Sequence, residues 1–246
     1  MEMIYRKTFS ISDLHADCFL RLKPSVLLYF AQEVAADHAY QLGTGWETLH
    51  QKNLFWAIIR HKVQITRLPV SGETITVETW PLPATRVAYP RATIAYDAEG
   101  KELFRTMALW VLMDTESRTM VLPGKSGVDV PGIVRGLEAD TPSSIAPKPL
   151  EHTVTHTVGY AMLDRNGHMN NTRYLDLLDD LLPADFHKDH PAKEFTVCYL
   201  SEAKEQQQLT LNWALSATNL LSVDIVRDRS ETPGKQERVF AAHIQF

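Results

Sequence analysis

Residues 163–183 read LDRNGHMNNTRYLDLLDDLLP and join a polar cluster to an amphipathic pattern. From Thr172 the apolar residues recur at helical spacing, and Pro183 predicts that the helix stops after residue 182. Asn170 is predicted to cap this helix, because an Asn side chain accepts from the first free backbone N–H groups. Capping does not explain three earlier polar residues, which alternate along the chain: Asp164, Asn166 and His168. In an extended segment this spacing puts all three side chains on one face, beside a helix N-terminus that favours negative charge.

The composition is that of an ordinary soluble globular protein. The chain has 246 residues, of which 44% are hydrophobic and 22% charged, with a formal net charge of -5. Because the charge is mildly negative and no block of Lys and Arg occurs, nucleic acid is not expected as the main partner. No run of about 18 apolar residues predicts a membrane span, and the N-terminus lacks the apolar core of a signal peptide. A cytoplasmic protein without membrane contact is therefore expected.

Neither the cysteines nor the histidines predict a metal centre. Cys18 and Cys198 stand alone, without metal or redox spacing, and each is expected to be a small buried or half-buried side chain. Two pairs of histidines have no third potential ligand at a spacing typical of metal sites: His152 with His156, and His187 with His190. No metal site and no cofactor are predicted.

A helix and several strands precede a segment rich in proline and glycine. Residues 22–42 are predicted to be a helix, in which Pro24 suits the first turn and Gly43 the C-terminal end. Strands are predicted at 54–67, 73–80, 86–96 and 102–113. Residues 123–150 contain five prolines and four glycines with little periodicity, which predicts a linker crossing a surface. After it we expect a strand at 151–160, the helix of 172–182, and strands at 193–200, 207–217, 220–228 and 237–246.

The two halves of the chain repeat the same order of elements. An offset of 147 places Asp17 on Asp164 without a gap, and an offset of 134 lays residues 69–77 over 203–211. We interpret the chain as two copies of one α+β unit, each a long helix against an antiparallel sheet. The expected division is an N-terminal unit at 1–130, a linker at 131–150 and a C-terminal unit at 151–246.

Only the second copy carries the full set of polar groups. At the matching positions the first copy has Phe19, Arg21 and Leu68, in place of Asn166, His168 and Glu202. A purely structural requirement of the fold should appear in both copies. The asymmetry therefore favours a functional role for the polar groups of the second copy.

The stretch DRNGHMNNTRYLD resembles the signature Asp-x-Asn-x-His-x-Asn-Asn-x-x-Tyr of the acyl-acyl carrier protein thioesterases, and YLSEA follows about thirty residues later. The resemblance covers essentially the whole chain and implies two tandem hotdog units, each a sheet wrapped around a long helix. Where plant members often carry a cysteine after the glutamate, this chain has Ala203, and residues 204–208 (KEQQQ) lack the Gly-Asp turn of the family. No plant-type targeting extension is present, so a bacterial enzyme is expected. The catalytic set that the family implies falls on Asp164, Asn166, His168 and Glu202.

These residue types suit attack by water on a thioester. The leaving thiolate has a parent pKa of ~8.5, so strong acid or a metal is not required. Glu202 is the natural base, Asn166 and His168 can hold the water and the carbonyl group, and Asp164 can fix their orientation. Free N–H groups at the helix start, at residues 169–171, are expected to stabilise the oxyanion. The alternative, in which His168 is the base and Glu202 its partner, stays open on sequence alone.

The expected function is hydrolysis of fatty acyl-acyl carrier protein to free fatty acid and carrier, which ends fatty acid synthesis. The alternatives are an acyl-coenzyme A thioesterase and a non-catalytic module that binds the acyl carrier. The partner is expected to be acyl carrier protein with its acyl chain, and the protein a monomer or homodimer.

Two further expectations concern where the substrate binds. The first copy lacks the polar set, so its interior is expected to hold the acyl tail, around residues 27–35 and 54–59. Acyl carrier protein is acidic, so a local basic patch is expected to steer it, with Arg165 and Arg173 as the nearest candidates.

Overall fold

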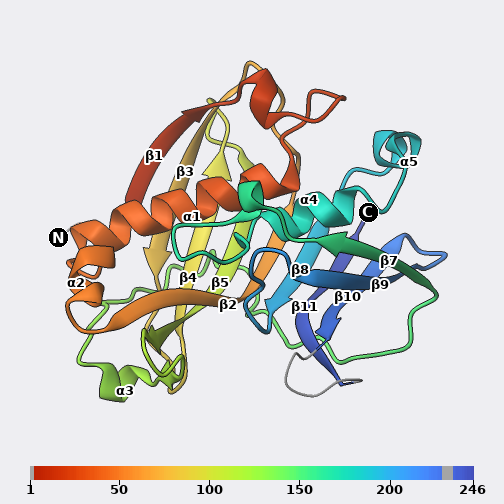
Figure 1. Cartoon of the computed structure of the whole chain (residues 1–246). Coiled ribbons are helices and arrows are strands. Elements are labelled where there is room, and N and C mark those ends of the chain that lie inside the picture. The colour runs from red at the N-terminus through yellow and green to blue at the C-terminus, as the bar shows by residue number, and fades with distance from the viewer. Residues whose placement is uncertain (1–2, 229–234) are drawn as a thin grey trace. The chain divides into compact units, whose positions relative to one another are not determined.

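The computed structural model describes residues 3–228 and 235–246. The chain divides into two compact units, residues 1–142 (unit 1) and 143–246 (unit 2), and each has an antiparallel sheet with a helix (Figure 1). The division falls inside the segment 131–150, which the sequence predicts to be a linker. Except for β1 and β6, which the sequence analysis did not locate, every strand lies within three residues of a predicted one.

The sheet of unit 1 has the order β1-β3-β4-β5-β2, all neighbours antiparallel, with β6 paired to β5. Its strands are β1 (Tyr5–Ser10), β2 (Leu54–Ile65), β3 (Thr74–Pro81), β4 (Tyr89–Tyr96), β5 (Glu102–Asp114) and β6 (Met120–Val121). The helix α1 (Pro24–Gln41) begins with Pro24 in its first turn and is followed by Gly43 at φ 72°, as the sequence predicts.

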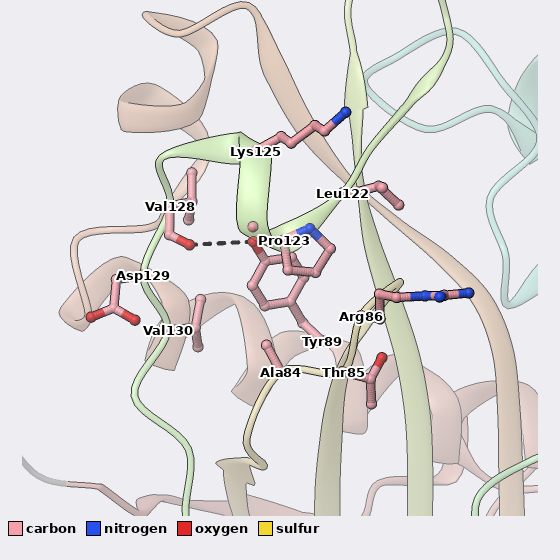
Figure 2. A pocket seen from close by; sticks show the side chains of 11 residues that line it. Ala84, Thr85, Arg86, Tyr89, Leu122, Pro123, Lys125, Val128, Asp129 and Val130 are labelled. Carbon is pink, nitrogen blue, oxygen red and sulfur yellow. Dashed lines mark hydrogen bonds between the residues drawn. The ribbon is translucent and has the colours of Figure 1, made fainter.

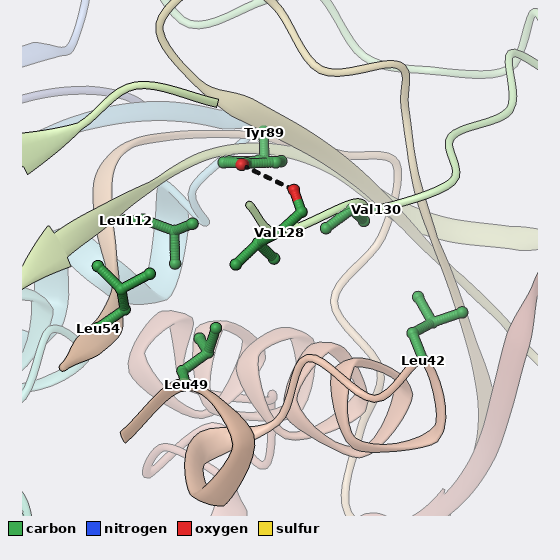
Figure 3. Packing of buried hydrophobic residues seen from close by; sticks show 7 residues of the cluster. All are labelled: Leu42, Leu49, Leu54, Tyr89, Leu112, Val128 and Val130. Carbon is green, nitrogen blue, oxygen red and sulfur yellow. Dashed lines mark hydrogen bonds between the residues drawn. The ribbon is translucent and has the colours of Figure 1, made fainter. Parts of the chain in front are cut away.

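One face of this sheet is covered by α1 and by the short helix α2 (Trp46–His50). Phe30 of α1 stacks on Phe9 of β1, with ring centroids 4.2 Å apart. At the other end of α1, leucines from the helices meet leucines and an aromatic ring of the sheet (Figure 3). This cluster contains Leu42, Leu49, Leu54, Tyr89, Leu112, Val128 and Val130. Its burial holds the C-terminal end of α1 against β2, β4 and β5.

The predicted linker is largely irregular, but it is closely packed. After α3 (Pro123–Ser126) the chain runs over the opposite face of the unit 1 sheet, where the Ile133 N–H donates to the Pro81 carbonyl at 2.9 Å. Ala139 is buried there with Trp80. A Cβ at Gly132 would lie 2.1 Å from the carbonyl carbon of Leu82, so only glycine fits at this approach. Residues 130–142 therefore form part of unit 1 rather than a free connection.

The sheet of unit 2 has the order β8-β11-β10-β9-β7, again antiparallel throughout. Its strands are β7 (His152–Thr157), β8 (Glu194–Tyr199), β9 (Gln208–Leu215), β10 (Leu220–Asp228) and β11 (Gln236–Gln245), and its helices are α4 (Arg173–Asp179) and α5 (Ala184–Asp189). Tyr174 of α4 stacks on Phe240 of β11 at a centroid distance of 4.6 Å. A helix on an antiparallel sheet thus occurs in both units, in agreement with the predicted α+β fold class.

The helix of unit 2 is shorter than its pattern predicts. It spans Arg173–Asp179 rather than residues 172–182, and Thr172 occupies the N-cap position. Asn170 is therefore not the cap. Its side-chain oxygen accepts from the N–H and the hydroxyl of Thr172, both at 2.9 Å, and so closes a turn one step earlier.

The backbone confirms the internal repeat at the first offset, residue for residue. In unit 1 the Asp17 N–H donates to the Arg21 carbonyl at 2.7 Å, and in unit 2 the Asp164 N–H donates to the His168 carbonyl at 2.8 Å. Asp17 also accepts from the N–H groups two and four residues later, and so does Asp164. Both units therefore build the same aspartate-closed turn before their helix.

The second offset is confirmed in the same way. The Leu22 N–H donates to Pro69 in unit 1, and the Met169 N–H donates to Ala203 in unit 2, both at 2.8 Å. Where unit 1 has Gly72 at φ 91°, unit 2 has Gln206 at φ 63°. The segment KEQQQ thus makes the same turn as its match in unit 1, with a glutamine in the left-handed conformation in place of a glycine. This fixes the register of Glu202 against the motif.

The aspartate turn allows a stability test, because its left-handed position is Gly167 (φ 75°) in unit 2 and Leu20 (φ 64°) in unit 1. Gly167→Ala should lower the free energy of unfolding by about 1 kcal/mol, since the new Cβ meets no neighbour and only the backbone conformation is penalised. Leu20→Gly should have the opposite sign and a smaller size, since the Leu20 side chain is 57% exposed and little burial is lost. Urea unfolding of both variants measures the effect, and a neutral Gly167→Ala would contradict it.

Candidate active site

Two of the four predicted catalytic residues are in direct contact. His168 Nε2 lies 3.2 Å from Glu202 Oε2. The His168 side chain is 15% exposed and that of Glu202 is 41% exposed, so the carboxylate can be reached by water. His168 ends the aspartate turn, and Glu202 lies in the loop between β8 and β9. The hydrogen bond from the Met169 N–H to the Ala203 carbonyl joins these two segments and holds His168 beside Glu202.

Asp164 acts on this pair through the backbone. Its Oδ1 accepts from the N–H groups of Asn166 at 2.8 Å and His168 at 3.3 Å. Asp17 makes the equivalent bonds in unit 1, where the histidine and the glutamate are absent, so Asp164 holds a turn that both units share. This satisfies a structural requirement that both copies share.

Asn166 is exposed, and its side chain donates only to Asp164 Oδ2, at 3.4 Å, within the residues that the structure describes. The sequence analysis placed Asp164, Asn166 and His168 on one face of an extended segment, and this was wrong. The segment is a turn, because Gly167 adopts the left-handed conformation and reverses the chain. The turn keeps the Asn166 side chain in contact with that of Asp164, but the strand-like alternation does not describe how the three side chains lie.

The predicted oxyanion donors are mostly engaged in other bonds. The Met169 N–H donates to Ala203, and the Asn170 N–H donates to Met162, both at 2.8 Å. The Asn171 N–H has no hydrogen-bond partner within residues 3–228 and 235–246. Of the three backbone donors expected at 169–171, only that of Asn171 can receive a developing negative charge.

Arg227 of β10 fixes the main chain of Glu202, and sequence reasoning missed it. Its Nη1 donates to the Glu202 carbonyl oxygen and to Gln207 Oε1, and its Nη2 donates to Ser201 Oγ at 2.9 Å. Glu237 of β11 balances the charge at 3.0 Å. The guanidinium thus ties both ends of the β8–β9 loop to the sheet. No motif marks Arg227, because it stands alone in an ordinary strand sequence.

Neither cysteine is placed to react at this site. Cys198 is 1% exposed on β8, and its thiol lies 3.6 Å from the Ser143 carbonyl oxygen. Cys18 is exposed, so its predicted burial was wrong; it lies in the aspartate turn of unit 1. Burial excludes Cys198 from water and substrate, which disfavours a thiolate nucleophile.

The matching positions of unit 1 hold no such acid–histidine pair. Arg21 stands in the place of His168 and forms an ion pair with Asp17 at 3.1 Å, while Leu68, in the place of Glu202, is buried. The same backbone therefore carries reactive groups in unit 2 and inert ones in unit 1.

Unit 1 has an open pocket of about 620 Å³ beside α3. Tyr89 lies at its centre, with its hydroxyl bonded to Ser126 Oγ at 2.8 Å and to the Val128 carbonyl oxygen at 3.2 Å. The charged side chains of the lining, Arg86, Lys125 and Asp129, extend away from the tyrosine ring (Figure 2). None of the predicted catalytic residues lines this pocket.

Two other classes of feature are absent from the described part of the chain. Within residues 3–228 and 235–246, no group of three or more His, Cys, Asp or Glu side chains could hold a metal ion. In the same residues, no helix is long and apolar enough to cross a membrane.

Two family models match the chain in tandem. Residues 2–122 match the acyl-ACP thioesterase N-terminal domain, and residues 148–245 match the acyl-ACP thioesterase C-terminal domain. The chain belongs to the acyl-ACP thioesterase family. The two matches coincide with the two repeated units.

Relatives with assigned names are distant. A chloroplastic dodecanoyl-[acyl-carrier-protein] hydrolase of Cinnamomum camphora is 24% identical over 81% of this chain and 56% of its own length. A chloroplastic palmitoyl-acyl carrier protein thioesterase of Gossypium hirsutum is 24% identical over 88% of this chain and 56% of its own length. The chain thus spans little more than half the length of these relatives.

Solved structures share the whole fold. An acyl-ACP thioesterase from Bacteroides thetaiotaomicron superposes with a TM-score of 0.82 at 24% identity, over 99% of this chain and 98% of that one. The 12:0-ACP thioesterase from Umbellularia californica superposes with a TM-score of 0.80 at 21% identity, over 100% and 97%. The predicted architecture of two tandem hotdog units is confirmed.

Proposed function

We propose that this protein hydrolyses the thioester of fatty acyl-acyl carrier protein, releasing free fatty acid and carrier and so ending fatty acid synthesis. The observation that carries the proposal is the contact between His168 and Glu202. It occurs where the repeated backbone of unit 1 has Arg21 and Leu68, so the fold itself does not require it. Membership of the thioesterase family supports the same reaction class.

The chemistry we propose is direct attack by water. Glu202 removes a proton from water as the oxygen bonds to the thioester carbon, His168 holds the carboxylate through Nε2, and the Asn171 N–H faces the developing oxyanion. Collapse of the tetrahedral intermediate breaks the carbon–sulfur bond and releases a thiolate, which takes up a proton. Since that thiolate has a parent pKa of ~8.5, its departure needs no metal.

The two units have different roles in the proposed reaction. Unit 2 supplies the reacting groups, and the apolar interior of unit 1 holds the acyl tail. In α1, residues 27, 28, 30, 31, 34 and 35 are buried. Leu54 and Ile58 of β2, a strand of the unit 1 sheet, are buried as well. The named relatives differ in the acyl chain that they release, so chain length is not carried over from them.

A cytoplasmic location is part of the proposal. Both cysteines are free thiols, as is usual in a reducing compartment.

The test is a thiol-release assay on the full chain, with acyl-acyl carrier protein and acyl-coenzyme A compared at matched chain lengths. A higher kcat/KM for the carrier substrate supports the proposal. A preference for coenzyme A would support the nearest alternative. Absence of release from either substrate by folded protein would contradict a thioesterase and favour a carrier-binding module.

Carrier docking gives a separate prediction, which uses the two arginines that flank the motif. Reversing the charge of Arg165 should raise KM for acyl-acyl carrier protein about two- to fivefold at low salt, and the effect should fade as salt screens the attraction. Arg173→Glu, at the second candidate position, should raise KM in the same salt-dependent way. Lys188→Glu, at an exposed position on α5, is the matched control. If KM and its salt dependence stay unchanged in Arg165→Glu, the carrier docks elsewhere.

A further inference from the structure

The helix-covered face of the unit 1 sheet carries charge where packing favours apolar residues. Arg91 of β4 and His61 of β2 both pair with Ala108 of β5, one from each side. Side chains directly opposite in antiparallel strands point to the same face. That face is the one covered by α1, because Arg91 Nη1 lies 3.1 Å from Nδ1 of His38 on α1. The methyl group of Ala108 therefore lies between two hydrogen-bonding side chains inside unit 1.

Arg91 is a buried cation without a counter-ion. It is 8% exposed, and its two hydrogen-bond partners are neutral: His38, and the Thr79 hydroxyl at 3.3 Å. No carboxylate pairs with it among residues 3–228 and 235–246. Burial lowers the pKa of Arg91 to about 10, so the guanidinium stays charged at neutral pH. A buried charge of this kind is strongly unfavourable unless something compensates it.

His61 has an unused ring nitrogen on the other side of Ala108. Its Nε2 is 2.9 Å from the Thr106 hydroxyl, while its buried Nδ1 has no partner in the described residues. Burial lowers the pKa of His61 to about 3, so the ring is neutral at physiological pH. When Nε2 accepts from the threonine, Nδ1 carries the proton and can donate to a ligand.

The surrounding fold does not compensate the positive charge of the Arg91 guanidinium. His38 lies in the last turn of α1, where the carbonyl end of the helix favours a cation. That attraction is much weaker than the penalty for burying a guanidinium without its counter-ion. A methyl-ended acyl chain would worsen the penalty, because it removes water and offers no acceptor. A carboxylate removes the penalty and satisfies the free donors.

We propose that the interior of unit 1 binds a carboxylate at the far end of an acyl chain, held by Arg91 with His61 on the other side of Ala108. This rests on the proposed function, since it names the class of acyl chain that unit 1 accepts. Acyl chains with a terminal carboxylate are then preferred substrates over methyl-ended chains of the same length.

The first experiment measures binding without turnover. The full chain is titrated by calorimetry with the monomethyl ester of a dicarboxylic acid and with the methyl ester of the fatty acid of equal length. Both probes carry an ester head, and only the first has a charged tail. The wild type should bind the carboxylate-tailed ester about 10- to 100-fold more tightly, the range expected for a charge-assisted hydrogen bond. Arg91→Met should abolish the preference, and Arg91→Lys should keep part of it.

The second experiment uses thiol release from carrier substrates with the same two tails. The wild type should favour the carboxylate tail in kcat/KM, and Arg91→Met should remove that preference. Arg118→Met, an exposed position of the same unit, is the matched control and should change neither quantity. Thermal melting checks folding, and Arg91→Met should stay folded because it removes an uncompensated charge.

Two results would overturn the proposal. One is a wild type that binds both esters equally. The other is an Arg91→Met variant whose only change is tighter binding of longer methyl-ended chains, which would make Arg91 a polar end-stop for the tail. Failure of the proposed function is distinguishable, because a protein that cleaves no thioester can still show the tail preference in the calorimeter.

Discussion

Glu202→Gln is expected to lower kcat roughly 10²–10⁴-fold while changing KM little. The substitution keeps the shape of the side chain and its hydrogen bond to His168, whose Nε2 lies 3.2 Å away, but removes the group that accepts a proton. Arg227 holds the Glu202 carbonyl oxygen, so the loop should keep its conformation in the variant. Steady-state thiol release across substrate concentrations separates kcat from KM.

Cys198→Ala is the matched control for this prediction, because Cys198 lies four positions before Glu202. Its thiol is buried on β8 and lies 3.6 Å from the Ser143 carbonyl oxygen, so the variant should keep nearly full turnover. A folded but inactive Cys198→Ala, beside a Glu202→Gln of near-normal rate, would replace water attack with a cysteine nucleophile. Thermal melting of both variants shows whether a lost rate reflects lost structure.

The tandem α+β organisation could be predicted from the sequence, because the two halves have matching residues at fixed offsets. The aspartates at 17 and 164 close the same turn, and the two offsets reproduce the hydrogen bonds of both units. Strand positions followed from alternating or mostly apolar runs bounded by turn residues. The length of the second helix was less predictable, because the apolar spacing continues past Asp179 although the helix does not.

The site was harder to predict because one spacing has two structural meanings. Residues at i, i+2 and i+4 share a face in a strand, but a turn closed by a left-handed glycine does not keep this alternation. The match between Asp164 and Asp17 indicates a structural role in the turn, and a catalytic role for Asp164 stays a prediction. Arg91 and Arg227 carry no sequence signal, since a lone arginine in a strand is usually a surface residue.

His168→Gln should keep at least tenfold more activity than His168→Ala if Glu202 is the base. The amide nitrogen of glutamine can replace Nε2 as the donor to Glu202, so the carboxylate stays oriented, while alanine leaves it unsupported. Alanine should then lower kcat roughly 10²–10⁴-fold. If His168 is itself the base, glutamine cannot take the proton, and the two variants should be equally slow.

The double variant Glu202→Gln, His168→Ala separates the roles further. Groups that act as one unit are not additive, so the double variant should be about as slow as the slower single variant rather than slower by the product of both losses. Additive losses would mean that the two side chains act independently, and the contact between His168 and Glu202 would then not be a catalytic pair. Because Asp164 holds the His168 main chain, Asp164→Ala should lower stability and kcat together, unlike either substitution within the pair.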